Sequence, residues 1–209
     1  MIAIVDYGLG NLRSAQKGFE KAGHAAIVSD DPETIARADA VVLPGVGAFR
    51  DCYEGLRARG FVGALLEAAQ NGKPFLGICV GLQLLFDESE EGKGSQGLGV
   101  FPGKVVRFPD RKELGLKVPH MGWNQLKPQT EPPCPLLTRT SPAPYMYFVH
   151  SYYALPEDQS LVLATSDHGI EFPAMVGSGN VYAVQFHPEK SQTEGINVLK
   201  AFGDLVKKE

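Results

Sequence analysis

The 209 residues include 44% apolar and 21% charged side chains, a composition typical of folded globular proteins and unlike that of disordered chains. The formal net charge is −4, so the chain lacks the basic surface that binds a phosphate backbone, and nucleic acid is not the expected partner. The three cysteines, Cys52, Cys79 and Cys134, have no short spacing, which argues against a disulfide framework and a zinc site. We expect one domain without metal or cofactor that acts on a small molecule or with another protein.

The first five residues are apolar, but the run ends at Asp6 and has no basic flank. The run is too short for a signal peptide or a membrane span. We therefore expect a cytoplasmic protein with no membrane partner.

Short β-branched runs alternate with helical stretches in the first half, which predicts βαβ units around a parallel sheet. The expected strands are residues 2–5, 25–28, 40–43 and 74–78. Three helices are expected from apolar residues at helical spacing and from end signals. The first has the apolar stripe Leu12, Ala15, Phe19 and Ala22 and ends before Gly23, and the second is short and begins at Asp31-Pro32-Glu33. The third has the apolar stripe Leu56, Phe61, Leu65, Leu66 and Ala69 and ends before Asn71-Gly72.

The second half predicts further strands, a smaller antiparallel sheet and one closing helix. The expected strands are residues 100–108, 118–126, 145–149, 161–165 and 181–185. Prolines 128, 132, 133, 135, 142 and 144 indicate an irregular surface loop. The last helix, residues 194–207, places Ile196, Leu199, Phe202 and Val206 on one face.

Residues 73–86 contain the strongest chemical signal. An apolar strand leads through Gly77-Ile78-Cys79-Val80-Gly81 into an amphipathic helix, the strand-turn-helix pattern of a nucleophile elbow. The central side chain of this turn is exposed on strained backbone, so the residues two positions away must lack a Cβ atom. We predict Cys79 as the nucleophile, with the amides at the helix start favouring the thiolate. The alternative is a small buried hydrophobe, which we expect for Cys52 and Cys134.

His187 is the candidate base, because an apolar strand ends at His187-Pro188-Glu189. The imidazole would protonate the leaving amine, and it needs an acceptor that fixes its tautomer. Residues two apart on an extended chain project to one side, which would place Glu189 beside the ring, and Pro188 keeps His187 out of the helical region. The order Cys, His, Glu differs from that of α/β-hydrolases. The alternative is a strand-end histidine without a chemical role.

These motifs resemble those of class I glutamine amidotransferases, and the resemblance spans essentially the whole chain. Four further segments, residues 6–12, 43–49, 119–124 and 147–152, resemble the branch that serves histidine biosynthesis. The resemblance implies a single α/β domain with a mostly parallel central sheet flanked by helices. It also implies that Cys79, His187 and Glu189 form a triad that hydrolyses glutamine to glutamate and ammonia.

The loop Pro44-Gly45-Val46-Gly47 follows a predicted strand, and its two glycines permit backbone conformations closed to other residues. That suits an oxyanion loop, and the resemblance implies that the amides of Val46 and Val80 form the oxyanion hole. From the residues alone, an ordinary turn between strand and helix remains the alternative.

The resemblance further implies that Gln83, Glu91, Ser151 and Tyr152 border the glutamine, with Glu91 near its charged amino group. The alternatives are a polar helix face for Gln83 and Glu91, and an ordinary strand exit for Ser151 and Tyr152.

The ammonia must be used elsewhere, because the chain has no phosphate-cradling motif and no room for a synthase domain. The resemblance implies a heterodimer with a (β/α)₈-barrel cyclase subunit that makes imidazole glycerol phosphate and aminoimidazole carboxamide ribotide. It also implies that Asn11, Met121, Trp123 and Lys190 face this partner. Because the geometry of the oxyanion loop can act as a switch, we predict low activity without the partner. A buried core tryptophan is the alternative for Trp123.

Two other functions remain as alternatives. One is the glutaminase of another pathway, such as pyridoxal phosphate or anthranilate synthesis. The other is a catalytically silent binding module, against which the complete Cys, His and Glu set argues.

Overall fold

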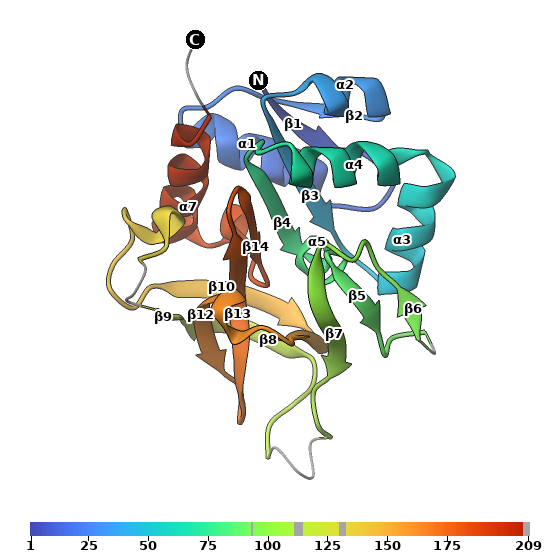
Figure 1. Cartoon of the computed structure of the whole chain (residues 1–209). Helices are drawn as coiled ribbons and strands as arrows, with labels where there is room; N and C mark the ends of the chain where they lie inside the picture. Colours follow the sequence, from blue (N-terminus) through green and yellow to red (C-terminus); the bar gives the residue numbers. More distant parts are fainter. Residues whose placement is uncertain (93, 111–114, 130–132, 207–209) are drawn as a thin grey trace.

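The computed structural model describes residues 1–92, 94–110, 115–129 and 133–206, and its largest element is an eight-stranded sheet (Figure 1). The spatial order is β2-β1-β3-β4-β14-β13-β12-β9. The strands are β1 (Ile2–Val5), β2 (Ala26–Ser29), β3 (Ala40–Gly45), β4 (Phe75–Cys79), β9 (Lys127–Pro128), β12 (Val162–Asp167), β13 (Glu171–Ser178) and β14 (Val181–Val184). Neighbours from β2 to β14 run parallel, and neighbours from β14 to β9 run antiparallel. The expected mostly parallel central sheet is confirmed.

Helices flank this sheet in two groups (Figure 1). They are α1 (Leu12–Lys21), α2 (Pro32–Arg37), α3 (Phe49–Ala58), α4 (Phe61–Gln70), the one-turn α5 (Val80–Gln83) and α7 (Gln192–Asp204). Helix α1 packs against α7, and α4 contacts both α2 and α3. Right-handed crossovers put these two groups on opposite faces of the parallel strands.

Two smaller sheets lie beyond the carboxyl ends of the parallel strands (Figure 1). One has the order β11-β7-β5-β6, and the other pairs β10 with β8 antiparallel. Their strands are β5 (Phe86–Ser89), β6 (Ser95–Gln96), β7 (Phe101–Arg107), β8 (His120–Gln125), β10 (Tyr145–His150) and β11 (Tyr152–Pro156). Short 3₁₀ helices are η1 (Pro135–Leu137), η2 (Gln159–Leu161) and η3 (Pro188–Lys190). The smaller sheets therefore face the edge at which the parallel strands end.

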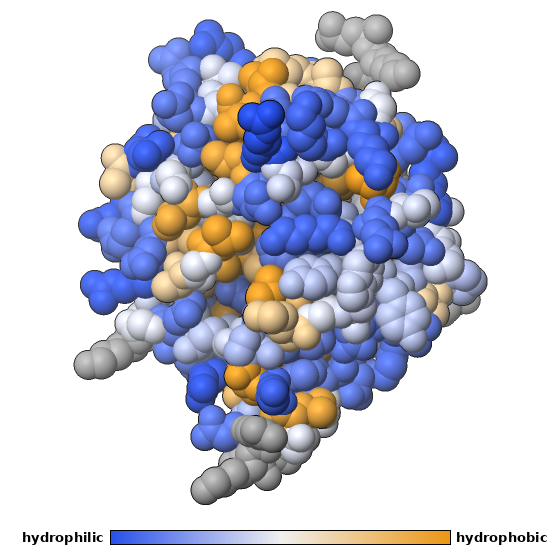
Figure 2. Space-filling view, turned by 180° about the vertical axis from the view of Figure 1, so that it is seen from behind, coloured by the Kyte–Doolittle hydropathy of each residue, from blue (hydrophilic) through white to orange (hydrophobic). Residues whose placement is uncertain are grey.

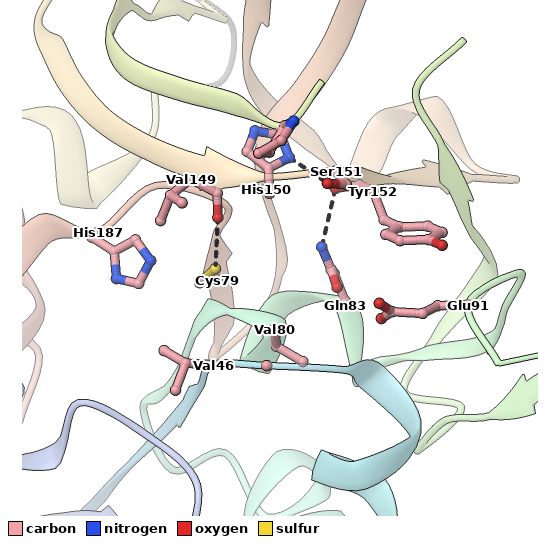
Figure 3. Close-up of a pocket in the computed structure, with 12 residues that line it drawn as sticks. Val46, Cys79, Val80, Gln83, Glu91, Val149, His150, Ser151, Tyr152 and His187 are labelled. Carbon is pink, nitrogen blue, oxygen red and sulfur yellow. Dashed lines mark hydrogen bonds between the residues drawn. The ribbon is translucent and has the colours of Figure 1, made fainter. Parts of the chain in front are cut away.

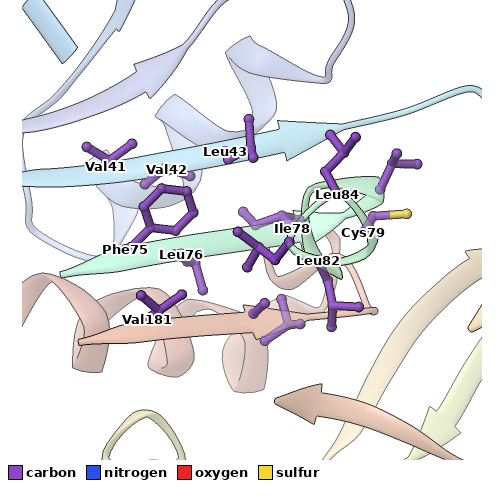
Figure 4. Close-up of a cluster of buried hydrophobic side chains, with 14 of the residues drawn as sticks. Val41, Val42, Leu43, Phe75, Leu76, Ile78, Cys79, Leu82, Leu84 and Val181 are labelled. Atoms are coloured by element: carbon purple, nitrogen blue, oxygen red, sulfur yellow. The ribbon is translucent and has the colours of Figure 1, made fainter. Parts of the chain in front are cut away.

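The four strands predicted in the first half are confirmed, with no end displaced by more than two residues. Strands β1, β3 and β4 are buried along their whole length, which explains why they read as unbroken apolar runs. Figure 4 shows this apolar cluster, with Cys79 at the carboxyl end of β4. The core of the molecule therefore sits directly behind the predicted nucleophile.

Two helix predictions are wrong. The stripe from Leu56 to Ala69 belongs to two helices, because Gly60 adopts a left-handed conformation (φ +75°) and ends α3 before α4 begins. The helix after Cys79 is a single turn and not the amphipathic helix that we predicted. Leu82, Leu84, Leu85 and Phe86 are all fully buried, so this segment has no polar face, and the chain continues directly into β5.

The proline-rich segment 128–144 is irregular as predicted, but it is not wholly a surface loop. Leu136 in η1 is fully buried, and η1 packs against α7. Cys134 is buried beside the sulfur of Met175, at 3.9 Å. Residues 130–132, including Pro132, lie outside the described part of the chain, as does Lys207 at the predicted end of the last helix.

Hydrophilic side chains cover most of the face in Figure 2, and hydrophobic ones gather there in small groups. Within the described residues, no helix is long and apolar enough to cross a membrane. The cytoplasmic location stays a prediction.

Candidate active site

Cys79 ends β4 on strained backbone, with φ +56° and ψ −110°. A Cβ atom on Gly77 would lie 2.8 Å from the Gly81 carbonyl oxygen, and one on Gly81 would lie 1.9 Å from that of Leu43. The predicted need for glycine on both sides of the cysteine is therefore confirmed. The turn directs the sulfur away from the apolar cluster (Figure 4).

The short length of α5 changes the predicted role of the helix in favouring the Cys79 thiolate. A four-residue helix has only a small macrodipole, because the dipole grows with the number of aligned peptide units. Stabilisation of a negative sulfur must therefore come mainly from individual groups close to Cys79. The Gln185 side chain lies close to the sulfur, with its Nε2 at 3.8 Å.

His187 follows β14, and its Nδ1 lies 2.8 Å from Glu189 Oε1. His187 has the predicted extended backbone, but Glu189 lies in the 3₁₀ helix η3 and not on an extended chain. Ser191 Oγ donates to the His187 carbonyl at 2.6 Å and accepts from the Tyr147 amide at 2.9 Å. A compact turn, rather than side-chain alternation along a strand, therefore places the carboxylate beside the ring.

The pKa of His187 is raised from 6.5 to about 10. Burial of the ring opposes protonation, but the interactions with Cys79 and Glu189 outweigh it. Nε2 is buried and makes no hydrogen bond to any described residue, so it is open to a reacting group. The ring is therefore positively charged at neutral pH, with one N–H held by Glu189.

A pocket of about 310 Å³ brings Cys79 and His187 together (Figure 3). Its walls come from the end of β4, from α5, β10 and β11, from the turns that follow β3, β5 and β14, and from the segment before β8. The lining residues are Val46, Gly47, Cys79, Val80, Gln83, Glu91, Pro119, Val149, His150, Ser151, Tyr152 and His187. The predicted nucleophile, base, oxyanion residues and glutamine contacts thus surround one cavity.

The loop that contains Val46 is held from behind by two buried side chains. The Tyr7 hydroxyl donates to the Pro44 carbonyl at 2.9 Å, and the Cys52 thiol donates to the Val46 carbonyl at 3.4 Å. Burial is the main reason that the pKa of each donor is raised, so both keep their protons. Sequence reasoning missed both contacts, because no local pattern predicts that the Tyr7 and Cys52 side chains meet these carbonyls.

The two loop glycines serve different purposes. Gly47 has a φ of +97°, as the prediction requires. Gly45 instead provides space, because a Cβ atom there would lie 2.8 Å from the Val80 Cβ and 2.9 Å from the Gly81 amide nitrogen. The loop and the elbow are therefore in direct contact.

The four predicted glutamine contacts occupy one side of the pocket (Figure 3). Gln83 is buried, so the polar helix face is wrong for it. Glu91 lies in a turn after β5 and not on a helix, and its Oε2 accepts from the Phe49 amide at 2.7 Å. Ser151 and Tyr152 lie where β10 passes into β11.

A second histidine, His150, also lines the pocket and was not singled out by the sequence. Its Nδ1 lies 2.8 Å from the Tyr152 carbonyl oxygen, and its Nε2 lies 3.0 Å from Nδ1 of His120. Burial lowers the pKa of His150 to about 3 and that of His120 to about 4. Both rings are therefore neutral and are bound to each other rather than to a carboxylate.

Of the predicted partner residues, Met121, Trp123 and Lys190 are exposed and Asn11 is half-buried, and both Trp123 and Lys190 lie beside Tyr147. Trp123 is 46% exposed and Met121 is 63% exposed, so the buried core alternative for Trp123 is wrong. The Trp123 and Tyr147 rings lie 6.1 Å apart, and Lys190 Nζ lies 6.0 Å from the Tyr147 ring. Asn11 lines a small recess beside Glu189.

The model of the class-I glutamine amidotransferase family matches residues 3–204. The imidazole glycerol phosphate synthase subunit HisH of Syntrophotalea carbinolica is 59% identical, over 98% of this chain and 100% of its own length. The subunit of the same name from Geobacter sulfurreducens is 52% identical, over 98% of both chains. Among solved structures, a glutamine amidotransferase superimposes with a TM-score of 0.75 over 99% of both chains, and PurLQS from Thermotoga maritima with 0.73 over 99% of this chain and 98% of that one. At 21% and 19% identity these two structures support the fold alone.

Proposed function

The chain belongs to the class-I glutamine amidotransferase family, and we propose that it is the glutaminase subunit of an imidazole glycerol phosphate synthase in histidine biosynthesis. It hydrolyses glutamine and delivers the ammonia to a cyclase subunit, for which we propose a (β/α)₈ barrel. The relatives at 52% and 59% identity carry this subunit's name, which favours it over a glutaminase of another pathway.

One observation carries the chemical part of the proposal. Cys79 and His187 are 108 positions apart in the chain, yet both face one pocket, and Glu189 binds the far nitrogen of the imidazole. A nucleophile, a base and an orienting acid in this arrangement support acyl transfer.

In the first half-reaction, the Cys79 thiolate attacks the side-chain amide carbon of glutamine. The imidazolium of His187 gives its Nε2 proton to the amide nitrogen, the carbon–nitrogen bond breaks, and ammonia leaves a thioester on Cys79. In the second half-reaction, neutral His187 takes a proton from water, whose oxygen attacks the thioester. Glutamate leaves and the thiolate and imidazolium are restored.

The negative charge of each tetrahedral intermediate needs hydrogen-bond donors. We propose the backbone amides of Val46 and Val80, because both residues line the pocket and their segments touch at Gly45. Loss of one such donor costs on the order of 3 kcal/mol of transition-state stabilisation, so the orientation of the Val46 peptide can switch activity. We propose that the partner subunit sets this orientation and that the isolated chain turns over slowly.

Gln83, Glu91, Ser151 and Tyr152 form the opposite wall, where we propose that they hold the amino-acid end of glutamine. Glu91 is suited to the ammonium group, because among the described residues its carboxylate accepts only from the Phe49 amide and can accept more hydrogen bonds.

The partner surface in this proposal consists of Met121, Trp123, Tyr147 and Lys190, with Asn11 nearby. Large exposed aromatic and apolar side chains of this kind are typical of protein interfaces. Pro119 lines the pocket and Met121 lies two residues further along the chain, so the surface adjoins the site of ammonia release.

The test uses the complex of this chain with its cyclase subunit. Cys79→Ala should abolish synthesis from glutamine but leave synthesis from free ammonium intact. Cys134→Ala is the matched control, because it removes a buried thiol far from the pocket, and it should support both reactions. Loss of both reactions in a folded Cys79→Ala complex would mean that Cys79 is structural. Covalent trapping of Cys79 by a glutamine-analogue affinity label would exclude the catalytically silent alternative.

A further inference from the structure

Gln185 is a polar side chain that is fully buried next to the nucleophile. It follows β14 two residues before His187, and its exposed fraction is 0%. Its Nε2 lies 3.8 Å from the Cys79 sulfur, within the range of hydrogen bonds to sulfur. The chemistry described above gives this amide no role.

The direction of the Gln185 amide is fixed by a chain of hydrogen bonds. Gln83 Nε2 lies 3.1 Å from the Tyr152 carbonyl oxygen and 3.1 Å from Gln185 Oε1. The Tyr152 carbonyl can only accept, so the Gln83 group that faces it must be the NH₂ group. The same NH₂ group requires an acceptor at Gln185, which is Oε1. The Gln185 NH₂ group must therefore face the sulfur.

The Tyr152 carbonyl is itself held in place by the buried histidines. His150 donates from Nδ1 to this carbonyl at 2.8 Å, and His120 donates from Nδ1 to His150 Nε2 at 3.0 Å. Asn124 Nδ2 lies 3.1 Å from His120 Nε2, and it also donates to the Asp167 carbonyl. Every member of this series is satisfied by one set of tautomers, in which both histidines are neutral.

We propose that Gln185 is a further catalytic residue, whose amide N–H donates to the Cys79 sulfur and favours the charged nucleophile over the thiol. The donor is preorganised, because Gln83 and the Tyr152 carbonyl hold its orientation before any substrate binds. It compensates for the small dipole of α5, which provides little stabilisation of its own. This inference rests on the proposed role of Cys79.

The experiment measures alkylation of Cys79 by iodoacetamide as a function of pH, followed by peptide mass spectrometry on the full-length chain. The reagent reacts with the thiolate and needs no glutaminase activity, so the result is independent of the proposed reaction. Gln185→Met keeps the volume but removes the donor. The pH midpoint of alkylation should rise by about one unit, which means about tenfold slower alkylation below the midpoint.

Two further variants keep the test decisive. Gln16→Met is the matched control, because Gln16 lies on α1, does not line the pocket, and donates its side-chain amide to the Ala26 carbonyl of β2. The midpoint should not change in this variant. Gln83→Met removes the group that orients Gln185, so the midpoint should rise by a smaller amount. An unchanged midpoint in folded Gln185→Met overturns the proposal. If Gln185→Met does not fold, an unchanged midpoint in Gln83→Met overturns it.

Discussion

His187 follows β14 of the large sheet, whereas His150 ends β10 of the two-stranded sheet, and both rings line the pocket that holds Cys79. Both are buried, yet their pKa values move in opposite directions. That of His187 rises to about 10, and that of His150 falls to about 3. Burial alone favours the neutral ring in each case.

The partner of each ring accounts for the difference. His187 lies beside the Glu189 carboxylate and near Cys79, whereas His150 faces a backbone carbonyl and the neutral ring of His120. The pocket therefore has two regions. The charged region lies at the end of the parallel strands, and the neutral region is formed by the antiparallel sheet. The charged imidazole of His187 can give a proton to a leaving amine. His150 can only position other groups, because both of its ring nitrogens are already engaged in hydrogen bonds.

The largest expected effect separates the two histidines directly. His187→Asn removes the proton donor and should lower glutamine-dependent turnover of the complex by about 10³- to 10⁴-fold. His150→Gln should lower it by only about fivefold, the equivalent of one neutral hydrogen bond. Ammonium-dependent turnover is the control for both variants and should not change. Equal losses in the two variants would contradict the division between charged and neutral regions.

The second prediction concerns a substitution that removes the charge of Glu189 and keeps the shape of its side chain. Glu189→Gln should lower the pKa of His187, because the carboxylate is one of the groups that raise it. Turnover from glutamine should fall by about 10²-fold, and its basic limb should move to lower pH. The pH dependence of kcat for the complex measures both effects. A pH profile identical to that of the unaltered chain would show that Glu189 does not act on the imidazole.

The sequence predicted the charged region better than the neutral one. Gly77-Ile78-Cys79-Val80-Gly81 and His187-Pro188-Glu189 are local patterns, and their geometry follows from residues that are neighbours in the chain. The parallel strands that carry them were also predicted, because a strand buried on both faces reads as one apolar run.

The neutral region depends on contacts between distant segments. The His120–His150 and Gln83–Tyr152 contacts join residues 30 and 69 positions apart, and no local pattern predicts which of these side chains meet. Strands β11 and β13 were missed for a related reason, because pairing across a sheet rather than periodicity defines them. A polar residue at an inward strand position, such as Gln185, is the one signal that could have been used.

The third prediction concerns stability in acid. His120 and His150 stay neutral in the folded chain down to about pH 4, whereas unfolded histidines bind protons below about pH 6.5. Stability from these two groups is therefore complete above pH 6.5 and is lost as the pH falls toward 4. When the pH falls from 7 to 5.5, these two histidines should lower the free energy of unfolding by about 2 kcal/mol. In His120→Gln the decrease should be about half as large.

Urea unfolding at pH 7 and pH 5.5 measures this decrease in the unaltered chain and in His120→Gln. An equal decrease in the two chains would contradict the assignment of His120 as neutral in the folded state. His187 should act with the opposite sign, because its pKa is raised in the folded chain. Its contribution is complete below pH 6.5 and declines as the pH rises toward 10. The acidic and alkaline limbs of one stability curve therefore report the two regions separately.

The smallest effect tests whether a neutral donor also matters on the charged side of the pocket. Tyr7→Phe removes the hydroxyl that holds the Pro44 carbonyl, so a buried acceptor loses its partner and unfolding free energy should fall by about 1 kcal/mol. Tyr145→Phe is the matched control, because Tyr145 is 56% exposed, and it should change stability by less than about 0.5 kcal/mol. Since the Pro44 carbonyl lies two residues before the Val46 carbonyl that Cys52 holds, the loosened loop should also lower kcat with little change in KM. A stability loss without any change in kcat would show that Tyr7 supports the fold but not the oxyanion loop.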